Sequence, residues 1–278
     1  MKLSPTAVAL TLGLAGCATA ERPREGYVTV PGGRVWYAIM GDGPGTPLVV
    51  VHGGPGGGSW SLKVWEALGD GRRVVRYDQL GAGKADHPTD TTLYAVARYV
   101  QELQALRDSL GLDEIHLYGR SWGAMLVQAY MGTANPSGVR SVILSSPLVT
   151  TAQWEHDADS LLTFLPDSIE EVIARHEAAR SYDALVYRYM WGPTEFASTG
   201  TLKTFDATAW LRGLRLPTLF VTGQFDEATP ASTEMFSTLV PGSEFHVIPD
   251  AGHATENDNP EALLRTVRDF LRRVEGTR

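Results

Sequence analysis

Gly119-Arg120-Ser121-Trp122-Gly123 stands between a predicted strand and a predicted helix. The apolar run 115–118 precedes it, and residues 122–131, whose apolar side chains recur at helical spacing, follow it. A serine in a G-x-S-x-G pattern at such a junction lies on a sharp turn that lifts its hydroxyl out of the sheet, beside a helix N-terminus that favours developing negative charge. Ser121 is therefore the predicted nucleophile.

Short apolar runs alternate with helical patterns along most of the chain. A hairpin is predicted where residues 27–30 and 34–40 flank Pro31-Gly32-Gly33. Further strands are predicted at 48–51, 73–77, 115–118, 139–144, 218–222 and 245–248, and the clearest helices at 93–110, 122–131 and 260–274. Together with the serine turn, this alternation predicts the α/β-hydrolase fold: a mostly parallel central sheet flanked by helices.

The strand pattern disappears between residues 147 and 206, where Ala, Glu, Arg, Leu and Tyr recur at helical spacing. We interpret 147–206 as a small helical cap inserted into the sheet domain. The core is then built from two parts, 27–146 and 207–278.

A serine hydroxyl needs a base, and the base needs an orienting carboxylate; in this fold they follow in the order Ser, acid, His. Asp226 and His253 each follow a predicted strand, at the edge where open α/β sheets place their sites. We predict that His253 takes the proton from Ser121 and that Asp226 holds the imidazole. Asp250 is the main alternative for the acid, although it lies only three residues from His253.

The predicted oxyanion hole has two amide donors. One is the N–H of Trp122, the residue after the nucleophile. The other is assigned to Gly54, in the glycine-rich loop that begins with His52 directly after the strand 48–51. His52 itself is interpreted as a structural hydrogen-bonding residue.

The amino terminus has the features of a lipoprotein signal. Lys2 precedes an apolar run at 7–15, too short to span a bilayer, that ends in Leu14-Ala15-Gly16-Cys17, which resembles a lipobox. The hypothesis is a signal peptide at 1–16, lipidation of Cys17, a tether at 17–26 and a place in the bacterial cell envelope. The alternative is an unprocessed hydrophobic start and a cytoplasmic protein.

Composition excludes some classes of partner. The 278 residues carry a net charge of −8 with no Lys/Arg cluster, which argues against nucleic acid. No metal-ligand spacing is seen, and neither a metal nor another cofactor is predicted.

Several longer motifs resemble one family, the proline iminopeptidases and their amidase relatives. They are His52-Gly-Gly-Pro-Gly-Gly57, Tyr77-Asp78-Gln79-Leu80-Gly81-Ala82-Gly83-Lys84, Trp191-Gly192-Pro193-Thr194-Glu195-Phe196, Gly200-Thr-Leu-Lys203, Pro217-Thr218-Leu219, Asp226-Glu227-Ala-Thr-Pro230 and Gly252-His253. The resemblance implies a serine exopeptidase that releases the amino-terminal residue, preferably proline, from small peptides through an acyl-enzyme. The free α-amino group of the peptide is then held by Glu195 and Glu227. The cap looks shorter than is usual in that family, which would open the pocket.

Other functions remain open at this level. An esterase, a lactonase or an amino-acid amidase could use the same triad. A lipid-anchored binding protein on a degenerate hydrolase scaffold is a further hypothesis, although such proteins usually lose a triad member. Haloalkane dehalogenase and epoxide hydrolase chemistry is disfavoured because both need an Asp at the position of Ser121.

Overall fold

The computed structural model describes residues 24–163, 171, 174 and 182–276 of the chain. The predicted signal, Cys17 and most of the predicted tether lie outside these residues. The tether ends earlier than its predicted limit at residue 26, because Glu25 pairs with Ala38 and Gly26 with Tyr37 in the first pair of strands.

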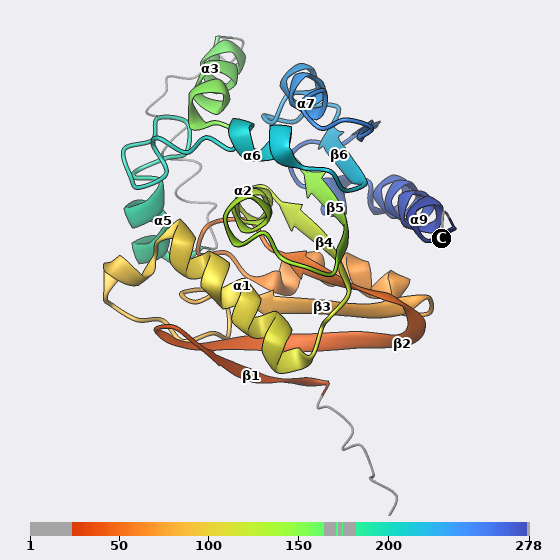
Figure 1. The fold of residues 1–278 in the computed structure, drawn as a ribbon. Coiled ribbons are helices and arrows are strands. Elements are labelled where there is room, and N and C mark those ends of the chain that lie inside the picture. Colours follow the sequence, from red (N-terminus) through yellow and green to blue (C-terminus); the bar gives the residue numbers. More distant parts are fainter. Residues whose placement is uncertain (1–23, 164–170, 172–173, 175–181, 277–278) are drawn as a thin grey trace, which may run out of the picture.

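A seven-stranded, mostly parallel sheet forms the centre of the molecule (Figure 1). Its strands are β1 (Glu25–Val30), β2 (Gly33–Val51), β3 (Arg72–Asp78), β4 (Ile115–Arg120), β5 (Val139–Ser145), β6 (Thr218–Gly223) and β7 (Glu244–Ile248). The strands β2, β4, β5, β6 and β7 follow one another in parallel, whereas β1 pairs antiparallel with β2. The sheet therefore confirms the predicted α/β architecture.

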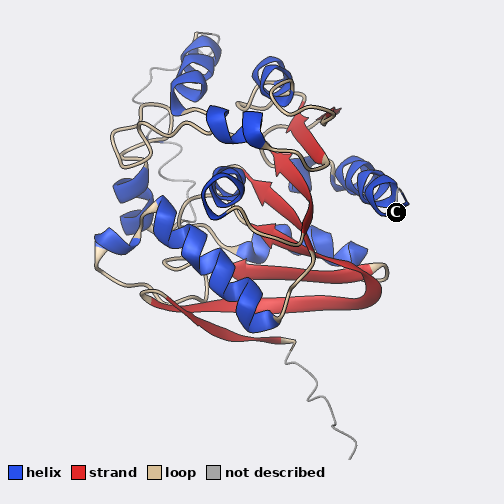
Figure 2. Ribbon diagram, viewed as in Figure 1, coloured by secondary structure: helices blue, strands red, loops and turns tan. Residues whose placement is uncertain are grey.

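The strand β2 is a long segment that folds back around β3. Its first arm runs antiparallel to β3, with Met40 opposite Val74. In the second arm, Leu48 also lies opposite Val74. From there the residue numbers of β2 and β3 increase in the same direction, so that Val50 lies opposite Arg76. The two arms, visible as the bent red ribbon in Figure 2, therefore enclose β3. They correspond to the two separate strands predicted at 34–40 and 48–51.

Helices cover both faces of the sheet. Their bounds are η1 (Ser59–Leu68), η2 (Thr91–Leu93), α1 (Val96–Leu110), α2 (Trp122–Ala129), η3 (Tyr130–Ala134), α3 (Thr151–Leu162), α5 (Ala184–Met190), α6 (Thr208–Gly213), α7 (Pro230–Ser237), α8 (Thr255–Asp258) and α9 (Pro260–Gly276). The core divides into two clusters: one holds the buried side chains of α1 and α2, the other those of η1 and α9. Among the described residues, every helix is too short or too polar to cross a membrane.

The central strands contribute side chains to both core clusters, because successive side chains of a strand point to opposite faces of the sheet. In the second arm of β2, Val49 and Val51 pack with α1 and α2, whereas Leu48 and Val50 pack with η1 and α9. All four are fully buried. The continuous apolar run at 48–51 thus reflects a strand covered on both sides.

The segment 147–206 leaves the sheet and returns to it at a narrow neck. Thr150 forms an isolated antiparallel bridge with Asp206, and on either side Thr151 N donates to Phe205 O and Ala207 N to Val149 O. Between these points lie α3 and α5. In Figure 1 the arrowheads of β4 and β5 point toward the side of the molecule where these two helices lie.

Candidate active site

Ser121 lies in the turn between β4 and α2, with φ of 54° and ψ of −125°. A positive φ is unusual for a residue with a Cβ and stores conformational strain. The turn is tight because its glycines leave no room for a side chain: a Cβ on Gly119 would lie 2.4 Å from Gly123 O, and one on Gly123 would lie 2.2 Å from Val51 O. The motif thus packs directly against the end of β2.

His253 and Asp226 are in direct contact. The Nδ1 atom of His253 lies 2.8 Å from Oδ1 of Asp226, whose carboxylate also accepts hydrogen bonds from the amides of Gly223 and Ala228. Although burial alone would raise the pKa of Asp226, the charge of His253 and these bonds lower it, so the carboxylate stays ionised. Asp226 therefore occupies the place of the orienting acid, and Asp250 does not.

His253 experiences an unusually negative environment. Glu227 Oε1 lies 3.7 Å from the same Nδ1 atom that Asp226 contacts. Burial alone would lower the pKa of His253, but the charges of Glu227 and Asp226 outweigh it and raise this pKa to about 9. The imidazole is therefore mostly protonated at neutral pH until some of that negative charge is offset.

Glu195 and Glu227 form an acidic pair beside the triad. Glu195 lies in the cap and is 9% exposed, and its pKa rises to about 7 because of burial and the charge of Glu227. The hydroxyl of Tyr187 accepts a hydrogen bond from Glu195 N and helps to hold its carboxylate. Two coupled carboxylates, Glu195 buried and Glu227 partly exposed, provide a place for a positive charge.

Two of the acidic residues and His253 lie close enough together to be considered as ligands for a metal ion. Asp226, Glu227 and His253 offer ligand atoms within 4.8 Å of one another. Nδ1 of His253, however, already lies at hydrogen-bond distance from Asp226, so a metal on that nitrogen would have to displace the proton between them. The donor set therefore fits a catalytic triad better than a metal site.

The two predicted oxyanion donors lie at the ends of neighbouring strands. Trp122 N is the first amide of α2, and Gly54 belongs to the loop after β2. Among the described residues neither amide donates a hydrogen bond, so both are available to a ligand. The loop is held from the cap, since Trp191 Nε1 donates to Gly54 O over 3.3 Å.

His52 and Gln79 brace this region. Gln79 N donates to His52 Nε2, so that nitrogen is the acceptor and Nδ1 carries the proton that reaches Gly53 O at 2.8 Å. Burial lowers the pKa of His52, which keeps it neutral. The side chain of Gln79 bonds His52 O and Trp122 Nε1, and it thereby joins the two halves of the oxyanion hole.

Arg120 is a site residue that sequence reasoning missed. Its Nη2 donates to His253 O over 3.0 Å, and its Nε lies 3.2 Å from the buried carboxylate of Glu256. Tyr118 donates to the same carboxylate. The residue before the nucleophile thus ties β4 to the loop that carries the base. The variable position in G-x-S-x-G gave no sequence signal for this role.

The cap contributes a second missed residue, Trp154 on α3. Its ring packs edge-on against His253, with the centroids 5.7 Å apart, and stacks with Phe196 at 6.4 Å. This contact covers the imidazole and strengthens its electrostatic interactions by removing water. Only the folded cap brings α3 to His253, so the sequence offered no cue.

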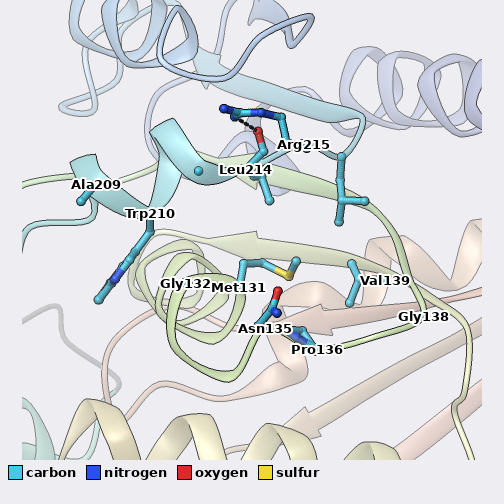
Figure 3. Close-up of a pocket in the computed structure, with 12 residues that line it drawn as sticks. Met131, Gly132, Asn135, Pro136, Gly138, Val139, Ala209, Trp210, Leu214 and Arg215 are labelled. Carbon is cyan, nitrogen blue, oxygen red and sulfur yellow. Dashed lines mark hydrogen bonds between the residues drawn. The ribbon is translucent and has the colours of Figure 1, made fainter.

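A large cavity of about 610 Å³ lies elsewhere (Figure 3). Met131 and Asn135 line one side of it and Leu214 the other, near the starts of β5 and β6. The catalytic residues follow the carboxyl ends of the strands, so this cavity lies away from the chemistry. A smaller cavity of about 190 Å³ adjoins Gly53 and Arg120, beside the nucleophile.

Comparison with known proteins places the chain among α/β hydrolases. A family model for the alpha/beta hydrolase fold matches residues 46–183. The chain is 40% identical to the proline iminopeptidase of Heyndrickxia coagulans over 90% of this chain and 99% of that one, and 32% identical to that of Levilactobacillus brevis over 89% and 96%. The solved structure of the Mycobacterium smegmatis proline iminopeptidase superposes with a TM-score of 0.81 at 27% identity, covering 91% of this chain and 99% of that one.

Proposed function

The chain belongs to the proline iminopeptidase family, and we propose that it is a serine aminopeptidase that releases one amino-terminal residue, preferably proline, from small peptides. The observation that carries the proposal is the acidic pair beside the triad. Glu195 is buried and electrostatically coupled to Glu227, which lies 3.7 Å from His253. A peptide's α-ammonium group held there presents its first carbonyl to Ser121.

The reaction proceeds through an acyl-enzyme. Ser121 Oγ attacks the carbonyl carbon while His253 Nε2 takes the hydroxyl proton and Asp226 holds the imidazole through Nδ1. The amides of Gly54 and Trp122 stabilise the oxyanion. His253 returns the proton to the departing amine, and a water activated by the same histidine then releases the amino acid and restores the serine.

The decisive test compares proline p-nitroanilide with its N-acetylated form. Acetylation removes the charge that Glu195 and Glu227 would bind and leaves the scissile bond unchanged. We expect kcat/KM to fall by about two orders of magnitude or more, because two charge-assisted contacts are lost. Equal turnover would favour an esterase, lactonase or general amidase instead. Ser121→Ala provides the control for activity from other enzymes.

The strength of the proline preference depends on the cap. The alignment with the Heyndrickxia coagulans protein spans 286 positions, more than the 278 residues of this chain, yet covers only 90% of them. The relative therefore contains segments that this chain lacks. If they belong to the cap, the pocket here accepts residues other than proline, and a panel of amino-acyl p-nitroanilides measures this directly.

We further propose that the mature protein is anchored to the bacterial envelope through a lipid on Cys17. The support is the sequence alone: Lys2, the short apolar run and the Leu14-Ala15-Gly16-Cys17 motif. In a bacterial host, Cys17→Ser should move the protein from the membrane fraction to the soluble fraction. Unchanged partitioning of that variant would refute the anchor and leave the aminopeptidase proposal untouched.

A further inference from the structure

The 190 Å³ cavity beside the nucleophile has two aromatic walls. Trp60 on η1 lies against Gly58, where an added Cβ would come within 2.8 Å of the indole Cδ1. Tyr182 at the edge of the cap lies against Gly57, where an added Cβ would come within 3.3 Å of the ring. Glycine at both positions thus lets flat rings form the surface.

The cavity lies where the leaving group of the substrate would depart, beside both the nucleophile and the catalytic base. Gly53 lines it, and a Cβ there would lie 3.6 Å from Ser121 Oγ. Ala254 also lines it and directly follows His253, which must deliver a proton to the departing amine. Neither Glu195 nor Glu227 is among the lining residues, so the cavity is separate from the acids that hold the α-amino group.

The chemistry of the walls favours an uncharged, flat group. Trp60 remains 57% exposed although it is a large apolar side chain, which leaves its surface available for contact. Among the described residues that line the cavity, Arg120 carries the one charge, and Glu256 at 3.2 Å already balances it. An acidic group would therefore find little net attraction. The volume exceeds the roughly 150 Å³ that holds a benzene ring in an engineered cavity.

We propose that this cavity binds the side chain of the residue that follows the cleaved bond, and that it favours an aromatic side chain there. The inference rests on the proposed function, because it assumes that the acyl part lies at Glu195 and Glu227. It adds a preference at the second residue of the peptide, set by Trp60 and Tyr182.

Three substrates and two variants test the proposal. Pro-Phe fills the cavity, Pro-Ala fills it poorly, and prolinamide, which releases ammonia, leaves it empty. We expect wild-type kcat/KM for Pro-Phe to exceed that for Pro-Ala by about tenfold, as stacking energies suggest. Trp60→Ala should remove most of this advantage and leave prolinamide hydrolysis unchanged. Tyr27→Ala, another exposed aromatic residue, on β1, is the matched control and should change nothing.

The outcomes separate the two claims. Equal wild-type rates on Pro-Phe and Pro-Ala would overturn the aromatic subsite, while prolinamide hydrolysis would still support the aminopeptidase. If Trp60→Ala lowered kcat/KM by the same factor on all three substrates, the aromatic subsite would also be overturned. If the wild type hydrolyses none of the three, the proposed function itself fails.

Discussion

Glu227 Oε1 lies 3.7 Å from His253 Nδ1, so the carboxylate assigned to the substrate amine also acts on the catalytic base. This contact helps to raise the pKa of His253 to about 9. An ammonium ion bound at Glu227 would offset its charge and lower that pKa. The base is thus more available when a substrate with a free amino terminus is bound than when the site is empty.

The first prediction concerns the pH profile of Glu227→Gln. Removing the charge should lower the pKa of His253 from about 9 toward its ordinary value of 6.5. The acid limb of kcat/KM for p-nitrophenyl acetate, which carries no amine, should then move to lower pH, because the neutral imidazole persists there. If the acid limb of kcat/KM lay at the same pH in wild type and in Glu227→Gln, the charge of Glu227 would not control the pKa of His253.

The second prediction concerns Glu195 and the amine. Its pKa of about 7 means that Glu195 loses its charge as the pH falls through neutrality. Since a neutral acid attracts an ammonium ion weakly, KM for proline p-nitroanilide should rise about tenfold from pH 8 to pH 6. In Glu195→Gln, KM should be high and nearly independent of pH. A flat wild-type KM would exclude this role for Glu195.

The third prediction uses the strain at Ser121. Glycine adopts a φ of 54° without the cost that serine bears, which is about 1–3 kcal/mol in sparsely populated regions. Ser121→Gly should therefore be inactive yet melt a few degrees higher than wild type. Ser121→Ala, which keeps a Cβ, is the control and should be inactive without that gain. Calorimetry or thermal unfolding followed by circular dichroism measures the difference.

The fourth prediction concerns the brace formed by Arg120. Arg120→Ala leaves Glu256, 2% exposed, without its cation, and breaking such a buried pair costs about 3–5 kcal/mol of unfolding free energy. The His253 loop also loses one of the two side-chain contacts that the described residues make at His253 O, the other being Ser146 Oγ, so kcat should fall more than KM rises. In Arg120→Ala/Glu256→Gln much of the stability should return, but kcat should stay low. Recovery of both together would indicate a purely structural role.

The fold was predictable from the sequence because several of the buried strands are short apolar runs bounded by turns. The runs at 115–118, 139–144 and 218–222 fall inside β4, β5 and β6. The helix expected at 93–110 begins later, at Val96, after a 3₁₀ turn. The long helix η1 was not predicted.

The site was less predictable wherever tertiary contacts make it. Asp226 and His253 could be named because both follow strands in a fixed order. Arg120, by contrast, acquires its role only when β4 and the loop after β7 meet, and Trp154 only when the cap covers His253. No local sequence pattern indicates such contacts between segments that are distant along the chain.

The neck at Thr150 and Asp206 has a consequence for how this enzyme could change over time. Hydrogen bonds join the two ends of the insertion, so the insertion leaves and re-enters the sheet domain at the same place whatever its length. Segments could be lost or gained beyond the neck without disturbing the register of β5 or β6. The insertion is thus an exchangeable module, and specificity could diverge while the catalytic strands stay the same.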